Sequence, residues 1–129
     1  MLIDTDGRVL LRKPKNEFDN YVWTFAKGRP LPGEKPEQAA LRAVLEECGV
    51  KAGIVRRIPG TFAGGTSDTI YYLMRPMETG LPMDDETEEI RWVDVDQAKK
   101  VISLTRNKVG RKRDLAVLDA ALAARESDV

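Results

Sequence analysis

The sequence contains no histidine and only one cysteine, Cys48, among its 129 residues. The absence of histidine excludes Ser-His-Asp and Cys-His catalysis, and it excludes every zinc site that needs a histidine ligand. A single cysteine cannot form an intrachain disulfide, which fits a reducing compartment, so we expect a cytoplasmic protein. Acid–base and metal chemistry must therefore fall mainly to Asp, Glu, Lys, Tyr or water.

The chain also lacks an excess of charge of either sign, since 21 basic and 21 acidic residues cancel. A chain without net charge has no general attraction to nucleic acid or to anionic membranes, although a local basic patch is still compatible with it. No apolar run reaches the length of a membrane-spanning helix, and no segment reads as a secretory signal. We therefore expect neither a membrane nor nucleic acid as a partner.

What the chain does have is an apolar content of 42%, enough for one domain with a real core over residues 1–129. Strands are predicted over 9–11, 21–25, 53–58, 69–75 and 89–95, with a turn at 5–7 and loops at 26–35, 60–68 and 79–88. Helices are predicted over 36–48, 97–103 and about 112–125. This order predicts an α+β domain in which helices pack against a mixed sheet.

Two adjacent carboxylates, Glu46 and Glu47, follow a loop rich in glycine and proline. The simplest interpretation is a solvated helix face on which Arg42 pairs with Glu46. The other interpretation is a Mg²⁺ site, because paired carboxylates supply hard oxygen ligands and substrate phosphates can complete the coordination. The predicted helix would turn an apolar face to the core, made of Ala40, Leu41, Val44, Leu45 and Cys48.

Residues 28–50 resemble the Nudix box, Gx5Ex7REUxEExGU, in which U is a bulky aliphatic residue. All but one of its fixed positions agree, namely Gly28, Glu34, Arg42, Val44, Glu46, Glu47, Gly49 and Val50. The resemblance extends over nearly the whole chain and implies the Nudix fold, an α/β/α sandwich with a central mixed β-sheet. It further implies hydrolysis of a pyrophosphate bond in a nucleoside diphosphate derivative, such as a nucleotide, a dinucleoside polyphosphate or a nucleotide sugar, with Mg²⁺ or Mn²⁺.

The exception is Ala43, where the family has glutamate. Ala43 shares a helical stripe with Glu46 and Glu47, so one of three clustered carboxylates is missing. In the family, that glutamate helps to hold metal. Its absence leaves open reduced activity, a relocated base, an engineered change, or a non-catalytic module that binds a nucleotide or a protein partner.

By resemblance, Glu46 and Glu47 are the expected catalytic and metal-binding residues, and the carbonyl of Lys27 is a further expected metal ligand. The side chains of Lys27 and Arg29 are candidates for contact with a substrate phosphate. Four residues are expected to organise the motif: Gly28, Glu34, Arg42 and Gly49. The expected partner is a small nucleotide-type substrate, and a homodimer is left open.

Two charged segments outside the box have two interpretations each. The acidic run 84–89 is either a solvated loop or the source of a catalytic base or metal ligand, for which Glu88 is favoured over Glu86 and Glu89. A basic cluster precedes the last predicted helix and is either a solvated surface or a contact for a polyphosphate tail. Its members are Arg106, Lys108, Arg111, Lys112 and Arg113.

Overall fold

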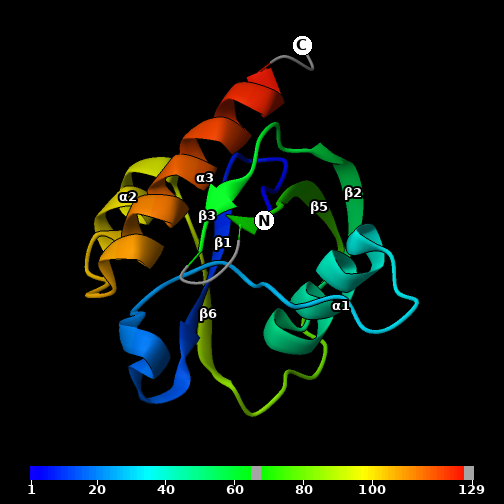
Figure 1. The fold of residues 1–129 in the computed structure, drawn as a ribbon, viewed down its shortest axis with the longest axis horizontal. Coiled ribbons are helices and arrows are strands. Elements are labelled where there is room, and N and C mark those ends of the chain that lie inside the picture. The colour runs from blue at the N-terminus through cyan, green and yellow to red at the C-terminus, as the bar shows by residue number, and fades with distance from the viewer. Residues whose placement is uncertain (65–67, 127–129) are drawn as a thin grey trace.

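The computed structural model describes residues 1–64 and 68–126, and its helices and strands are shown in Figure 1. In chain order they are β1 (Val9–Pro14), the 3-10 segment η1 (Lys15–Asn20), α1 (Pro36–Cys48), β2 (Lys51–Arg57), β3 (Phe62–Ala63), β4 (Asp68–Thr69), β5 (Tyr72–Glu78), β6 (Thr87–Val93), α2 (Val95–Ile102) and α3 (Lys108–Glu126). The predicted α+β class is confirmed. No helix in the described ranges is both long enough and apolar enough to cross a bilayer.

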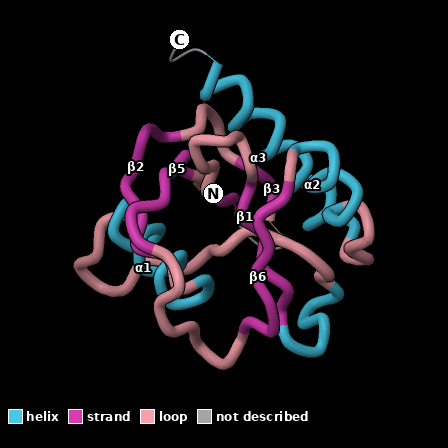
Figure 2. Tube along the Cα trace, turned by 180° about the vertical axis from the view of Figure 1, so that it is seen from behind, coloured by secondary structure: helices cyan, strands magenta, loops and turns pink. Residues whose placement is uncertain are grey.

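The strands pair as antiparallel ladders, β1 with β6, β2 with β5, and the short β3 with β4. The N-terminal segment connects two of these ladders. Leu2 forms a parallel bridge with Met74 of β5, and Ile3 forms an antiparallel bridge with Val9 of β1. The bridges make the arrangement mixed, as predicted. Seen from behind in Figure 2, α1 lies on one side of these strands and α2 and α3 lie on the other.

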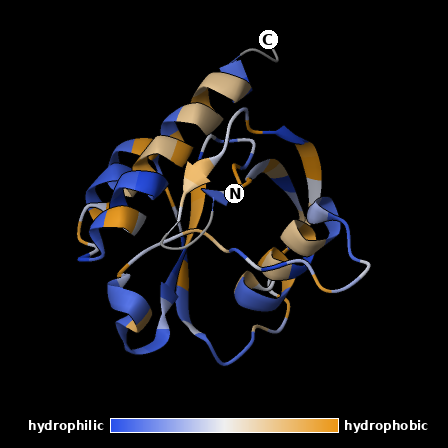
Figure 3. Cartoon of the chain, viewed as in Figure 1, coloured by the Kyte–Doolittle hydropathy of each residue, from blue (hydrophilic) through white to orange (hydrophobic). Residues whose placement is uncertain are grey.

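Alternate residues of the same strands enter two separate apolar clusters. One cluster contains Met1, Ile3, Val9, Leu11, Tyr71 and Leu73 together with residues of α2 and α3. The other contains Leu2, Leu10, Tyr72 and Met74 together with Val44 and Cys48 of α1. Because successive side chains of a strand point to opposite faces, helices cover both faces and form the α/β/α sandwich. Figure 3 shows that η1, away from these clusters, is predominantly hydrophilic.

Helix α1 has the predicted bounds, and local residues explain both ends. At its start, Pro36 occupies the first turn and the Lys35 N–H donates to Gln38 Oε1 at 2.9 Å. At its end, Gly49 has a φ of 65°, a left-handed conformation that favours glycine. A side chain at Gly49 would also overlap the Leu81 carbonyl, so glycine permits the close approach of the following acidic loop.

Several details of the prediction are wrong, including the strand predicted over 69–75, which the structure divides into β4 and β5. The segment 21–25 forms no ladder, and Thr24 only makes an isolated bridge with Arg12; burial of its aromatic side chains, rather than strand pairing, explains the apolar pattern. Leu45 is 41% exposed, whereas Ala43 and Glu47 are buried on α1. The predicted loop 60–68 contains β3, and its residues 65–67 lie outside the described part of the chain.

Candidate active site

The C-terminal end of α1 and the acidic loop meet at a cavity of about 380 Å³. The Leu81 N–H donates to the Gly49 carbonyl at 3.0 Å, and the Asp84 N–H donates to the Glu46 carbonyl at 2.7 Å. These bonds use carbonyls that the end of a helix leaves free, and they hold the acidic loop against α1. The charged residues that line the cavity are Arg12, Lys15, Asp19, Lys27, Glu47, Asp85 and Glu86.

Glu47 is buried in the wall of this cavity, with 9% of its surface exposed, and its charge is only partly compensated. Burial raises the pKa of Glu47 to about 7, and the nearby carboxylates of Asp84 and Glu86 add to the shift. The Arg12 guanidinium, with Nε 3.4 Å from Oε1, and a hydrogen bond from the Lys27 backbone oppose it. A carboxylate in this environment gains from an additional cation.

The Arg12 side chain, on β1, hydrogen-bonds mainly to residues at the start of β6 rather than to Glu47. Its Nε donates to Thr87 Oγ1 at 2.9 Å, and its Nη2 donates to the Glu86 carbonyl at 3.0 Å. The Lys15 N–H donates to the same carbonyl at 3.0 Å. These bonds fix the position of Glu86 beside the cavity, and they leave the Glu47 carboxylate with a longer and weaker contact to Arg12.

The two adjacent carboxylates of the motif lie in different environments. The Glu46 side chain is 53% exposed, and Arg42 Nη1 lies 3.3 Å from its Oε2. Ala43 lies on the buried stripe together with Glu47, and a Cβ built on Gly28 would lie 3.2 Å from the Ala43 Cβ. The carboxylate that this chain lacks is therefore absent from the buried side of the helix, where Glu47 lies.

Glu34 and Arg42 tie the Gly/Pro loop to α1. Arg42 Nε and Nη2 donate to the two carboxylate oxygens of Glu34, both at 3.0 Å, and Nη2 also donates to the Arg29 carbonyl at 2.9 Å. The Leu31 N–H donates to Glu34 Oε1 at 2.9 Å, and these hydrogen bonds lower the pKa of Glu34. Such a bidentate pair has the geometry that an organising role requires.

The acidic run 84–89 divides between the cavity and solvent. Asp85 and Glu86 line the cavity. Glu88 is exposed on β6 and is not among the lining residues, and Glu89 Oε2 accepts a hydrogen bond from Arg91 at 2.9 Å. The structure thus brings Glu86, rather than the favoured Glu88, near Glu47. The single sequence does not reveal this, because strand β6 begins at Thr87 and its register decides which residues remain in the loop.

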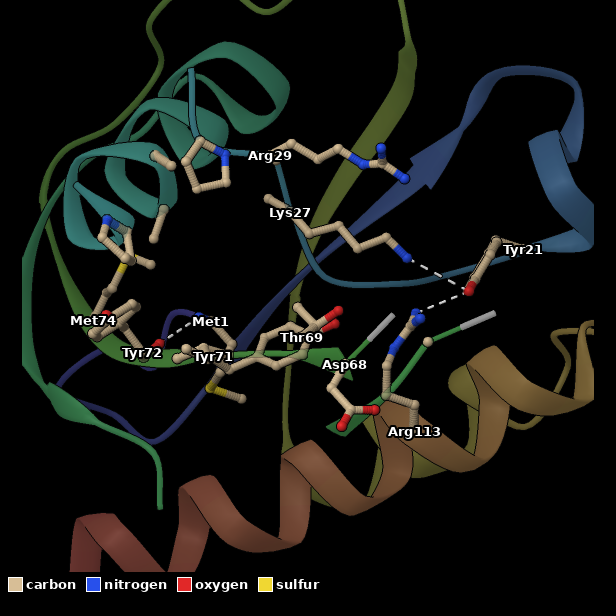
Figure 4. A pocket seen from close by; sticks show the side chains of 18 of the residues that line it. Met1, Tyr21, Lys27, Arg29, Asp68, Thr69, Tyr71, Tyr72, Met74 and Arg113 are labelled. Carbon is tan, nitrogen blue, oxygen red and sulfur yellow. Dashed lines mark hydrogen bonds between the residues drawn. The ribbon is translucent and has the colours of Figure 1, made fainter. Parts of the chain in front are cut away.

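A second, larger cavity of about 960 Å³ lies beyond the Gly/Pro loop (Figure 4). Lys27 and Tyr21 line both cavities, and Arg29 lines the larger one. Lys27 Nζ lies 3.5 Å from the Tyr21 hydroxyl, and Arg113 Nη2 donates to the same oxygen at 2.9 Å. Burial lowers the pKa of Lys27, and the nearby Arg113 lowers it further.

Sequence reasoning did not single out Asp114, and it considered Arg113 only as a member of the basic cluster before the last predicted helix. Asp114 is fully buried, accepts a hydrogen bond from Thr24 Oγ1 at 2.6 Å and pairs with Arg113 at 3.2 Å. A signal was present, because Arg113 follows the helical spacing of the buried residues Gly110, Val117 and Ala121. A methyl group at Gly110 would overlap the Tyr21 ring, so Tyr21 packs directly on α3.

The donors around the smaller cavity suit a hard divalent cation. Glu47 and Glu86 offer carboxylate oxygen atoms, which Mg²⁺ and Mn²⁺ prefer. Within residues 1–64 and 68–126, no three Asp, Glu or Cys side chains gather into a complete metal-binding group. Since protein-bound Mg²⁺ commonly uses only one or two carboxylates together with waters and substrate phosphates, the residues present fit an ion shared with a phosphorylated substrate.

Comparison with known proteins agrees with this fold. A family model described as NUDIX domain matches residues 1–114. An oxidized purine nucleoside triphosphate hydrolase from Danio rerio is 31% identical over 101 residues, which cover 75% of this chain and 65% of the relative. An isopentenyl-diphosphate Delta-isomerase from Nocardia farcinica is 34% identical over 107 residues, which cover 72% of this chain and 59% of the relative. The chain thus spans less than two thirds of the length of either curated relative.

A solved structure of a C. elegans Ap4A hydrolase has a TM-score of 0.65 and 23% identity to this chain. The match covers 95% of this chain and 96% of that one, so the whole fold is shared. The family match covers the motif, the acidic loop and all the strands β1 to β6, and it ends at Asp114, which pairs with Arg113. The chain belongs to the Nudix domain family.

Proposed function

We propose that this chain is a Mg²⁺- or Mn²⁺-dependent pyrophosphohydrolase that cleaves a nucleoside diphosphate derivative. The observation that carries the proposal is the buried, partly compensated Glu47 in a cavity whose wall also holds Lys15 and Lys27. A carboxylate that gains from a cation and ammonium groups that attract phosphate are the two requirements for binding a metal–phosphate substrate. The named activity of the Danio rerio relative, hydrolysis of a nucleoside triphosphate, agrees with this assignment.

The residues divide the work as follows. Lys15 and Lys27 bind and orient phosphate oxygens, and the Arg12 guanidinium keeps Glu86 beside the cavity through its carbonyl. Glu86 accepts a proton from the attacking water. Because Glu47 is buried, bulk water has limited access to its carboxylate. Glu47 and the carbonyl of Lys27 would hold Mg²⁺, which when bound would neutralise phosphate charge and favour ionisation of water.

The test is a coupled phosphate-release screen over nucleoside triphosphates, dinucleoside polyphosphates and nucleotide sugars, with Mg²⁺ and with Mn²⁺. Added pyrophosphatase converts the pyrophosphate released from triphosphates to phosphate, and added phosphatase does the same for the phosphomonoester products of the other two substrate classes. Glu47→Gln and Glu86→Gln should each lower kcat by about 10²–10⁴-fold, the range expected for loss of a positioned acid–base group or its equivalent. Glu88→Gln is the matched control, because it removes a neighbouring exposed carboxylate and should retain turnover. Loss of activity in Glu88→Gln with activity retained in Glu86→Gln would return the role of base to Glu88.

A non-catalytic Nudix module is the second candidate, and one observation favours it. Ala43 removes a buried carboxylate beside Glu47, and Glu46 is directed to Arg42 at the surface. Such a chain would bind nucleotides in the same screen without releasing phosphate. An isomerase acting on a diphosphate, the named activity of the Nocardia farcinica relative, would also release none, so product analysis of isopentenyl diphosphate separates these two outcomes.

A further inference from the structure

We propose that Tyr21, Lys27 and Arg113 form a second anion subsite, which binds a phosphoryl group of the substrate beyond the one that is attacked. The inference rests on the proposed function and narrows its substrate to compounds whose phosphate groups extend from the smaller cavity into the larger one. Lys27 and Tyr21 line both cavities, so the subsite adjoins the Glu47 site. Figure 4 shows Lys27 and Arg113 reaching the Tyr21 hydroxyl from different parts of the chain.

The Tyr21 hydroxyl is arranged to donate a hydrogen bond into this space. Its oxygen accepts from Arg113 Nη2 at 2.9 Å and from Lys27 Nζ at 3.5 Å. A phenol has two lone pairs and one proton, so with both lone pairs engaged its proton is directed elsewhere. Two cationic donors also polarise the phenol, which strengthens the hydrogen bond that this proton can make to an anionic oxygen.

The two cations differ in how their charge is balanced. Arg113 pairs with Asp114 at 3.2 Å. No ion pair joins Lys27 to a carboxylate in the described part of the chain, although its Nζ lies over the Tyr21 ring at 4.6 Å. Two like charges that share one hydroxyl repel each other, and a bound anion would relieve that repulsion.

A second hydroxyl in the same wall, that of Tyr71, has no hydrogen-bond partner of good geometry within residues 1–64 and 68–126, although Arg113 is near enough to influence it. Tyr71 is 4% exposed, lines the larger cavity and packs edge-to-face against Phe62, yet its hydroxyl forms no hydrogen bond of good geometry. A buried hydroxyl without a partner is costly, and nearly all such groups in proteins are satisfied. A phosphoryl group, with three acceptor oxygens, would satisfy Tyr71 together with Tyr21 and the two cations.

The larger cavity is not uniformly basic, and this limits where the anion binds. Asp19 and Asp68 also line it, and both would repel an anion near them. The anion is therefore expected at the Tyr21 hydroxyl, to which Lys27 and Arg113 both donate. The remainder of the cavity, lined partly by Ala39, Ala40 and Met74, suits an uncharged portion of the substrate.

The experiment is a calorimetric titration of inorganic tripolyphosphate into the metal-free chain in EDTA. Tyr21→Phe and Lys27→Met should each weaken binding by about tenfold or more, as expected for loss of a hydrogen bond to a charged group. Lys112→Met, which removes an exposed positive charge from the same helix as Arg113, is the matched control and should change affinity less than twofold. Equal weakening in all three variants would show only general charge attraction and would overturn the subsite.

Tyr71→Phe gives an independent readout, because it deletes only a hydroxyl that forms no hydrogen bond of good geometry with the described residues. Its thermal stability should equal or exceed that of the wild type, while tripolyphosphate binding weakens severalfold. Unchanged affinity in Tyr71→Phe together with tight binding of uncharged adenosine would assign the cavity to a neutral group and overturn the proposal. The titration requires neither metal nor turnover. Absence of hydrolysis in the phosphate-release screen would therefore refute the proposed function without changing the result for the anion subsite.

Discussion

Glu47 on α1 and Asp114 on α3 are both buried carboxylates, yet their surroundings differ. Asp114 receives a 2.6 Å hydrogen bond from Thr24 and pairs with Arg113 at 3.2 Å. Glu47 has Arg12 at 3.4 Å and a backbone hydrogen bond from Lys27, while Asp84 and Glu86 repel it. A buried charge whose hydrogen-bond partners are all present stabilises the fold. A buried charge that is only partly compensated can bind a ligand of opposite charge.

The difference between Asp114 and Glu47 assigns separate roles to the two regions that meet at the Lys27–Tyr21 contact. The Asp114 side supports a fixed guanidinium, and the Glu47 side keeps a carboxylate that gains from a cation. Proteins tolerate such local instability where function requires it. The comparison therefore predicts opposite effects on stability when the two charges are removed.

The largest expected effect is that of Asp114→Ala. Removing one partner of a buried ion pair leaves Arg113 uncompensated, and the free energy of unfolding should fall by about 3–5 kcal/mol. Urea denaturation measures this. Asp119→Ala, on the exposed face of the same helix and 3.9 Å from Lys99, should change stability by only about 0.5 kcal/mol.

A chain with Asp114→Ala that does not fold would leave the value unmeasured, so Thr24→Val provides a milder form of the same test. It removes the hydroxyl that donates to Asp114 and should lower stability by about 1–2 kcal/mol. Wild-type stability in Thr24→Val would mean that Asp114 does not need its partners, and the comparison with Glu47 would fail.

The second prediction is that Glu47→Gln stabilises the metal-free chain at alkaline pH. The folded pKa of Glu47 is raised to about 7 from an ordinary value of 4.5. Between these pH values the folded state binds more protons than the unfolded state, so stability falls as pH rises from 4.5 to 7. At pH 8 the variant should exceed the wild type by about 2–3 kcal/mol, and at pH 5 by much less.

Urea denaturation at pH 5 and pH 8 in EDTA measures the difference. Glu78→Gln, at an exposed carboxylate on β5, is the control and should follow the wild-type pH dependence. A less stable Glu47→Gln at pH 8 would show that Arg12 and Lys27 compensate the charge fully. Added Mg²⁺ should stabilise the wild type at pH 8 more than the variant, because binding to the native state raises apparent stability.

The third prediction concerns Ala43→Glu, which restores the family's carboxylate. Helix propensity alone suggests little effect on stability, but Ala43 is buried beside Glu47 and faces Gly28. A second buried carboxylate should therefore lower metal-free stability by about 1–2 kcal/mol. Mn²⁺ should recover most of that loss and raise kcat on any substrate found in the screen.

Ala43→Gln separates charge from size in this test. Glutamine occupies nearly the same volume as glutamate, so any overlap with Gly28 affects both variants alike. Recovery by Mn²⁺ in Ala43→Glu and not in Ala43→Gln would locate the cation beside position 43. Equal behaviour of both variants would mean that packing against Gly28 alone determines the effect.

Sequence reasoning predicted the elements that local residues specify. Helix α1 was placed at its observed bounds because Pro36 and Gly49 set its ends, and the α+β class followed from the order of patterns. Leu45 and the segment 21–25 were misassigned because helical spacing and aromatic content do not say which neighbour covers a residue. Tertiary packing decided both.

The site was predictable only where the motif specifies it. The pairing of Glu34 with Arg42 lies within one loop and one helix, so the motif spacing contains it. The contacts of Arg113 with Tyr21 and of Thr24 with Asp114 join residues about ninety positions apart, which no local pattern encodes. Glu86, rather than Glu88, reaches the cavity because of the register of β6.

The smallest expected effect is that of Glu46→Gln. The Glu46 side chain is half exposed and contacts Arg42 one helical turn away at 3.3 Å, so its loss should lower stability by only about 0.3–0.5 kcal/mol. Its backbone carbonyl, which accepts the Asp84 N–H at 2.7 Å, is unchanged, so the acidic loop should stay in place. Calorimetric titration with Mn²⁺ should then show less than a threefold loss of affinity, against tenfold or more for Glu47→Gln. An equal loss in both variants would show that the Glu46 side chain exchanges its contact with Arg42 for the ion, as the motif implies. The difference between exposed Glu46 and buried Glu47 on α1 would then disappear when metal is present.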